Sequence, residues 1–160
     1  MSNCTFCKEI ADIKRKKDPF FVAELKTGYV VMSWYQYFEG YTIFVLKNHS
    51  AELHELKSDL KDEFLCEMSL VAEAVYRAFK PKRLNYAKLG NSDPHLHWHI
   101  IPRYGTDPKP ERNIWAISKR VWQSDKHRPT LEKLNSLRKK LREEIEILLA
   151  SKKYKNCHGI

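Results

Sequence analysis

The chain has 160 residues, of which 42% are hydrophobic and 12% aromatic, with only 5 glycines. A chain of this length can bury the core of one domain, and its aromatic content excludes extensive disorder. The net charge of +9 is uneven, because residues 1–80 carry −1 and residues 81–160 carry +10. The basic half suits an anionic partner, such as a nucleotide or nucleic acid, or is simply a solvated basic surface.

The N-terminal stretch and the cysteines indicate the cellular compartment. The start "MSNCTFCKEIADIKRKKD" lacks the apolar core of a secretory signal, and no run approaches the ~18 apolar residues of a membrane span. Cysteines at positions 4, 7, 66 and 157 do not make a dense disulfide framework. We therefore expect a reducing cytoplasm and no membrane partner.

Strand-like runs come first in the chain. "FFVAEL" (20–25) and "YVVMSW" (29–34) are separated by a two- to three-residue turn, which predicts a hairpin. "YTIFVL" (41–46) is rich in aromatic and β-branched residues and predicts a third strand. Residues 84–90 and 95–101 predict two more.

Two helices are expected. Apolar residues recur every three or four positions after Ser58 and Asp59, up to Pro81, and leucines recur likewise over 130–150. Residues 104–128 have weak periodicity and predict a long irregular arm. The order of elements favours an α+β domain: an antiparallel sheet of about five strands, one central helix and a C-terminal helical extension.

The run "PHLHWHIIPRY" (94–104) places histidines on alternate residues of a predicted strand. His95, His97 and His99 therefore share one face, and the apolar residues between them share the other. Three interpretations are open: the imidazoles bind a metal, they form a nucleophile with supporting acid/base groups, or they are structural and bonded to backbone carbonyls.

Neighbouring residues favour phosphorus chemistry. Asn91 and Ser92 precede the strand and can donate hydrogen bonds to an oxyanion, and Arg103 follows it and can pair with a phosphate. An imidazole can attack phosphorus directly and form a covalent intermediate. It then needs one neighbour to hold its tautomer and another to protonate the leaving group.

These residues resemble the signature of the histidine triad (HIT) family, His-φ-His-φ-His-φ-φ with φ apolar, which is complete across 95–101. "CTFC", "EGYTIFVLKNH" and the helix before the triad extend the resemblance over residues 1–105. "HLHWH" and "YGTDP" resemble bacterial members described as diadenosine tetraphosphate hydrolase-like. The resemblance implies a HIT-like nucleotide-binding domain over 1–105, with 106–160 as a C-terminal arm and helix packing on the same domain.

The resemblance also implies roles. HIT proteins are homodimers that hydrolyse or transfer nucleoside monophosphates, so a homodimer with a nucleotide substrate is expected. His97 would attack the α-phosphorus and become nucleotidylated, His99 would lie by the phosphate, and His95 would support the triad. Asn91 and Ser92 match positions of polar phosphate contacts.

Two further positions belong to this comparison. Ser33 falls near the place where family members hold the ribose. The family's usual Gly-His-Thr strand start is here Gly40-Tyr41-Thr42. Tyrosine can share one hydrogen bond but cannot become a cation near neutral pH. The departure changes the support given to the triad and leaves the nucleophile in place.

Cys4 and Cys7 form one Cys-x-x-Cys pair, which alone is half a zinc site, a redox pair or chance. Some HIT proteins hold zinc with two N-terminal cysteines, a histidine in the position of His49, and the first triad histidine, here His95. The resemblance therefore implies a structural zinc, closed by four protein ligands. No redox cofactor is expected.

Three functions compete. The first is an enzyme acting on the α-phosphate of dinucleoside polyphosphates or related nucleoside phosphoesters through a nucleotidyl-histidine. The second is a nucleotide-binding or interaction protein with little turnover, suggested by Tyr41. The third, nucleic-acid binding, rests on charge alone and ranks last because no nucleic-acid motif is found.

Overall fold

The computed structural model of the chain describes residues 4–154 and centres on a five-stranded antiparallel sheet in the order β1-β2-β3-β5-β4. The strands are β1 (Phe21–Glu24), β2 (Gly28–Met32), β3 (Thr42–Leu46), β4 (Arg83–Ala87) and β5 (His97–Arg103). The helices are α1 (Thr5–Lys14), α2 (Ser58–Phe79), α3 (Lys119–Trp122) and α4 (Leu131–Ala150). This α+β architecture confirms the predicted fold class.

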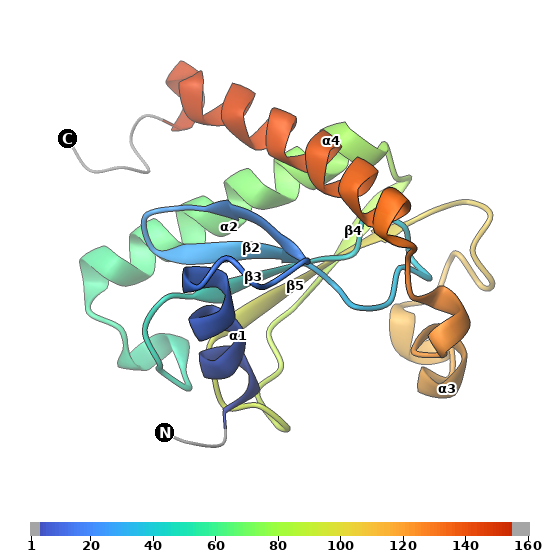
Figure 1. Ribbon diagram of the computed structural model, residues 1–160, viewed down its shortest axis with the longest axis horizontal. Coiled ribbons are helices and arrows are strands. Elements are labelled where there is room, and N and C mark those ends of the chain that lie inside the picture. Colours follow the sequence, from blue (N-terminus) through green and yellow to red (C-terminus); the bar gives the residue numbers. More distant parts are fainter. Residues whose placement is uncertain (1–3, 155–160) are drawn as a thin grey trace.

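Helices cover both faces of the sheet (Figure 1). The long helices α2 and α4 share one apolar cluster with the inner side chains of the strands, including Val30, Phe44 and Ile100. On the other face, Phe6, Ile10 and Ile13 of α1 pack against side chains of β2 and β3. The alternation of faces along each strand explains why successive residues belong to different clusters.

The β1–β2 hairpin is held from the helical side. The Glu67 carboxylate of α2 is fully buried and accepts hydrogen bonds from the backbone N–H of Lys26 (2.8 Å) and Thr27 (2.9 Å). Gly28 follows the turn, and a Cβ there would collide with the ring of Phe44 on the adjacent strand. The predicted short turn is therefore fixed by one buried acid and one close backbone approach.

Helix α4 is tied both to the sheet and to α2. Arg138 and Arg142 donate from Nε to the backbone oxygens of Phe21 (2.6 Å) and Val22 (2.8 Å) on β1. Beyond the C-terminal end of α4, Lys153 and Tyr154 contact Glu73 of α2. Leu134, Leu137, Leu141, Ile145 and Leu148 supply the buried stripe that the leucine spacing predicts.

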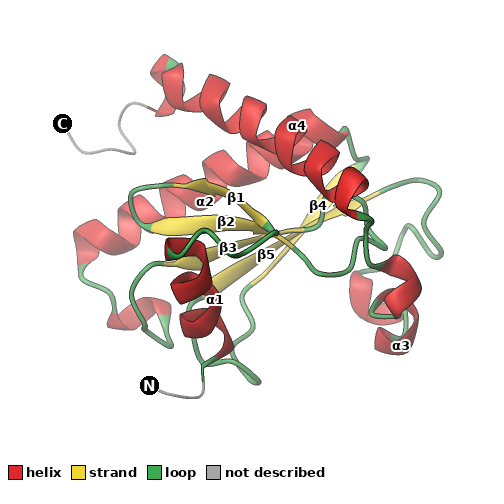
Figure 2. Cartoon of the chain, viewed as in Figure 1, coloured by secondary structure: helices red, strands yellow, loops and turns green. Residues whose placement is uncertain are grey.

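The structure differs from the prediction in two segments. Helix α1 was not expected. It packs against the sheet on the face opposite the predicted central helix α2. The arm over 104–128 is mostly loop, as Figure 2 shows, but contains α3 and two short 3-10 turns, Ile114–Ala116 and Asp125–His127. Across residues 4–154, no helix combines the length and apolar character needed to cross a bilayer.

Candidate active site

The histidine row lies on the face of the sheet that α1 partly covers. His97 and His99 belong to β5, and His95 lies just before its first residue. Leu96 and Ile100 point to the opposite face, where both are fully buried in the core shared with α2. The predicted division of the run into a polar and an apolar row is confirmed.

A chain of hydrogen bonds connects the row. His97 Nδ1 lies 2.6 Å from the backbone oxygen of His95, and His97 Nε2 lies 3.0 Å from His99 Nε2. The hydroxyl of Tyr41 lies 2.8 Å from His99 Nδ1. Because a carbonyl oxygen only accepts, His97 Nδ1 carries a proton, and in the neutral ring Nε2 keeps its lone pair.

Burial keeps these imidazoles neutral. Desolvation lowers the pKa of His97 below its ordinary value, and it lowers the pKa of His99 to about 4, with a smaller contribution from the neighbouring His97. A neutral imidazole presents a lone pair that can bond to phosphorus. The row is thus set up for nucleophilic chemistry rather than for carrying fixed positive charge.

A cavity of about 460 Å³ opens over His97 and His99. Asn91 and Ser92, in the turn that leads to β5, line it as the sequence predicts. Its other walls come from α1, from Tyr41, from the segment between β4 and β5, and from the arm: Phe6, Leu89, Asp93, Trp115, Ile117, Ser118, Lys119, Trp122 and Gln123. The cavity volume is within the range of small-molecule sites.

Ser33 lines a neighbouring cavity of about 210 Å³. This second cavity shares Tyr41, His99 and Trp122 with the first, so the two adjoin at the end of the histidine row. Ser33 follows β2 directly and is buried, with 7% of its surface exposed. The structure therefore brings Ser33 to the same region as the histidines.

Arg103 is not brought to either cavity. It lies four residues beyond His99 on the same face, and its side chain is 1% exposed. Its guanidinium pairs with Asp107 (2.8 Å) and donates to Asn85 and to backbone oxygens in the arm. With its donors engaged inside the protein, Arg103 holds the arm in place, which corrects the expectation that it contacts a phosphate.

Cys4, Cys7, His49 and His95 gather at the N-terminal end of α1, with one ligand atom of each lying within 4.8 Å of the others. Sγ of Cys7 lies 3.4 Å from Nδ1 of His49 and 3.6 Å from Nδ1 of His95. Zinc bonds of about 2.3 Å to sulfur and 2.05 Å to nitrogen at tetrahedral angles require an S···N separation of about 3.5 Å. The donor set fits a closed tetrahedral site.

The orientation of His95 also fits. Its Nε2 lies 2.8 Å from the backbone oxygen of Leu46, so Nε2 carries the proton. The lone pair of His95 then lies on Nδ1, which faces Sγ of Cys4 at 3.5 Å. A histidine that donates its second N–H to a carbonyl is the usual arrangement of a metal ligand.

Several lining residues were not foreseen. The ring of Phe6 lies 4.3 Å from that of His97, and Trp115 and Lys119 reach the cavity from the arm. Phe6, Ile10 and Ile13 recur at helical spacing, a signal that could have identified α1. Nothing in the local pattern of the arm shows which of its side chains faces the histidines.

Comparisons with known proteins agree on one family. The model of the HIT domain matches residues 15–106. "Protein hit" of Bacillus subtilis is 34% identical over 112 residues, 64% of this chain and 72% of that protein. "Adenosine 5'-monophosphoramidase HNT1" of Saccharomyces cerevisiae is 30% identical over 105 residues, 62% of each chain.

A solved structure gives the same result. The hypothetical histidine triad nucleotide-binding protein ST2152 from Sulfolobus tokodaii superposes with a TM-score of 0.68. It is 27% identical, and the match covers 89% of this chain and 94% of that one.

Proposed function

This chain belongs to the histidine triad (HIT) family, and from that premise we propose that it is a nucleotidyl hydrolase or transferase with His97 as nucleophile. The observation that carries the proposal is the hydrogen bond from His97 Nδ1–H to the carbonyl of His95, which leaves the Nε2 lone pair of His97 beside the cavity. The phosphoramidase activity in the name of the yeast relative supports the same chemistry.

The proposed reaction has two displacements at the α-phosphorus. His97 Nε2 forms a bond to phosphorus as the bond to the leaving group breaks, and the leaving atom takes up a proton. Water then attacks the nucleotidyl-histidine, the P–N bond breaks, and a nucleoside monophosphate leaves. The substrates would be dinucleoside polyphosphates or related nucleoside phosphoesters and phosphoramidates.

The other predicted site residues receive supporting roles in this proposal. His99 would donate from Nε2 to a phosphoryl oxygen, because that nitrogen lies 3.0 Å from the attacking atom. Asn91 and Ser92 would offer hydrogen bonds to the phosphate from the turn before β5. Ser33, in the adjoining cavity, would contact the ribose.

The experiment mixes the protein briefly with diadenosine tetraphosphate and records the mass of the intact chain, with products followed by chromatography. We expect a transient adenylate adduct and release of AMP in the wild type, and neither in His97→Ala. His54→Ala is the control, because His54 is exposed and lines neither cavity. Adduct formation by His97→Ala would remove the nucleophile assignment.

The runner-up is a nucleotide-binding protein with little turnover, favoured by Tyr41 in place of the family's usual histidine. The same experiment separates the two. Nucleotide binding by the wild type without adduct or AMP would establish the binding protein.

Zinc is proposed as the structural metal of Cys4, Cys7, His49 and His95. The support is the S···N separations of 3.4 to 3.6 Å and the carbonyl partner of His95. When bound, zinc would fasten the start of α1 to the segments that follow β3 and precede β5. Thiolate ligands suit a reducing compartment, so we also propose a cytoplasmic location.

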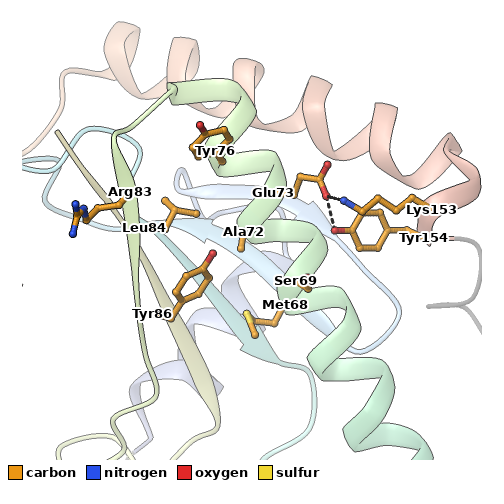
Figure 3. Close-up of a pocket in the computed structure, with 10 residues that line it drawn as sticks. All are labelled: Met68, Ser69, Ala72, Glu73, Tyr76, Arg83, Leu84, Tyr86, Lys153 and Tyr154. Carbon is orange, nitrogen blue, oxygen red and sulfur yellow. Dashed lines mark hydrogen bonds and ion pairs between the residues drawn. The ribbon is translucent and has the colours of Figure 1, made fainter. Parts of the chain in front are cut away.

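A homodimer is proposed through the edge of the sheet at β4. The strand is the last in the sheet order, and exposed aromatic side chains flank it: Tyr86 on β4 and Tyr76 on α2 are each 53% exposed. Figure 3 shows both around a surface cavity of about 650 Å³, with Leu84 between them. A second copy pairing along β4 would satisfy the strand edge and cover both rings.

A further inference from the structure

Tyr41 is the first member of a chain of hydrogen bonds that runs through His99 and His97 to the backbone oxygen of His95. Which atom donates in each bond follows from the His95 end. The His95 carbonyl fixes the proton of His97 on Nδ1, so the Nε2 of a neutral His97 only accepts. The Nε2 of His99, 3.0 Å away, must then be the donor. A neutral His99 with its proton on Nε2 accepts at Nδ1, so Tyr41 donates its hydroxyl proton there.

We propose that Tyr41 is a positioning residue that holds the ring of His99 in place, with the Nε2–H donor of that ring aimed at the atom of His97 that bonds to phosphorus. The proposal rests on the proposed function, in which a phosphoryl oxygen takes over the donor as His97 attacks. Tyr41 acts through His99 and supplies a hydrogen bond and no charge.

The surroundings of Tyr41 suit this role. Its ring is 4% exposed and packs in a cluster with Phe38, Ile101 and Trp122. Burial raises its pKa well above the ordinary value, so the hydroxyl keeps its proton over the range in which enzymes work. A buried hydroxyl with one acceptor in reach has a single favourable direction in which to donate.

The main chain of Tyr41 is fixed as firmly as its ring. Its backbone oxygen accepts from Ser33 N–H (2.8 Å) and from the Gln36 side chain (3.0 Å). Gly40 before it has φ +85°, a conformation that glycine adopts without strain, and donates to Gln36 Oε1. The hydroxyl therefore bonds to His99 without the conformational entropy cost of ordering a mobile side chain.

Removing the hydroxyl would free the ring of His99. In Tyr41→Phe, Nδ1 of His99 has no donor, whereas its Nε2–H still faces the lone pair of His97, so the tautomer is kept. The ring is then held at one nitrogen instead of two, and its donor is aimed less closely at the attacking atom. The fold would change little, because phenylalanine fills the same space.

The test compares Tyr41→Phe and Tyr41→His with Tyr104→Phe. Tyr104 is the matched control, since its hydroxyl donates to the backbone oxygen of Glu39 (2.8 Å) and lines neither cavity. ¹⁵N NMR of the resting protein reports the tautomer of His99. Rapid-mix mass spectrometry reports the rate of adduct formation from diadenosine tetraphosphate.

We expect the Nε2–H tautomer in every variant, because the lone pair of His97 still accepts from that proton. The ¹⁵N resonance of the unprotonated Nδ1 should match the wild type in Tyr104→Phe and shift in Tyr41→Phe, where no hydroxyl donates to it. The adduct rate of Tyr41→Phe should fall about tenfold with KM within about twofold, as for loss of one buried hydrogen bond. Tyr41→His, which can still donate, should restore the wild-type Nδ1 resonance and most of the rate. It also decides the matter if Tyr41→Phe does not fold.

The inference is overturned if the Nδ1 resonance of His99 in Tyr41→Phe matches the wild type, or if the adduct rate of that variant stays within twofold of the wild type. Failure of the proposed function looks different, because the wild type itself would then form no adduct. The NMR comparison needs no substrate, so in that case the Nδ1 resonance alone decides whether Tyr41 positions His99.

Discussion

The backbone and the side chain of His95 serve different neighbours. Its carbonyl oxygen accepts from Nδ1 of His97, and its own Nδ1 points to Cys4 and Cys7. One residue thus connects the orientation of the proposed nucleophile with the proposed metal site.

The zinc proposal is tested at this scale. Protein purified without chelator should contain about one zinc per chain by elemental analysis. Cys4→Ser and His49→Asn should each lose it, because three ligands bind zinc far less tightly than a closed set of four. His54→Asn, an exposed histidine outside the cluster, should keep it. A folded wild-type protein free of metal would rule the site out.

The sequence alone could predict which candidate residues lie close together where the chain itself supplies proximity. Asn91 and Ser92 lie within a few residues of His97, so a turn followed by a strand is enough to bring them to the cavity. Arg103 lies at a similar separation but runs away from His97 along the strand, to where the arm covers the face. Sequence distance alone does not distinguish these directions.

At the scale of elements, the arm contributes to the site from outside the matched HIT domain, as Phe6 of α1 does from the N-terminal side. Trp115 and Lys119 line the cavity, and both are exposed, Trp115 by 54%. Trp122 is instead buried against the cluster that holds Tyr41. An exposed indole and an ammonium group at the mouth of a cavity suit the base and phosphates of a leaving nucleotide.

The arm should therefore affect recognition of the leaving group. Trp115→Ala and Lys119→Ala should each raise KM for diadenosine tetraphosphate by about tenfold, in line with the loss of one stacking or phosphate contact. KM for adenosine 5'-phosphoramidate, whose leaving group is small, should change less than twofold. Lys126→Ala, elsewhere in the arm, is the control. Equal effects on both substrates would contradict a leaving-group role.

Helix α4 is fastened to α2 by one acid with two partners. Glu73 accepts from Lys153 Nζ (2.5 Å) and from the hydroxyl of Tyr154 (2.7 Å), as Figure 3 shows. The Lys153 hydrogen bond, ahead of those of Tyr154 and Arg77, lowers the pKa of Glu73 from 4.5 to about 2. A carboxylate whose pKa is lower in the folded state stabilises the fold only while it is ionised.

This contact predicts a pH dependence. The contribution of Glu73 should be fully present above pH about 4.5 and be lost as the pH falls towards about 2. Glu73→Gln should lower the free energy of unfolding at pH 7 by on the order of 1 kcal/mol, and the difference from wild type should shrink in acid. Glu143→Gln, an exposed pair with Lys139, is the control for denaturant titrations. A difference independent of pH would contradict the assignment.

The elements that were predicted correctly are those with a long periodic or a nearly continuous apolar pattern. Helices α2 and α4 repeat their buried residues over about three to four turns, and β2 and β3 are almost wholly buried. Helix α1 has only ten residues and three buried positions, too few to stand out beside charged neighbours. The short helices of the arm depend on tertiary contacts such as that of Arg103 with Arg112 O.

At the scale of the whole molecule, α4 shares one hydrophobic cluster with α2 and the sheet. We therefore propose that residues 106–160 complete the domain of residues 1–105 and do not form a separate unit. The boundary at residue 105 marks only how far the family resemblance extends. The buried leucines of α4 lie beyond it in the sequence but pack in the same core.

The proposed dimer predicts the effect of a charge at its centre. Tyr86→Glu should convert a dimer to a monomer in light scattering at micromolar concentration, because two carboxylates would face each other near the two-fold axis. Tyr35→Glu, which lies outside β4 and does not line the cavity beside it, should leave the mass unchanged. A monomeric wild type over the same range would contradict the proposed interface.

The two edge strands of the sheet, β1 and β4, differ in how far their backbone groups are already bonded or covered. On β1, Arg138 and Arg142 donate to the carbonyls of Phe21 and Val22, so two of the acceptors along that edge are already bonded. On β4, the last strand at the other end, Tyr86 is exposed instead. Strand addition is therefore favoured at β4 over β1. Two copies joined at β4 would present a β1 edge at each end, which disfavours the repeated pairing that builds a fibre.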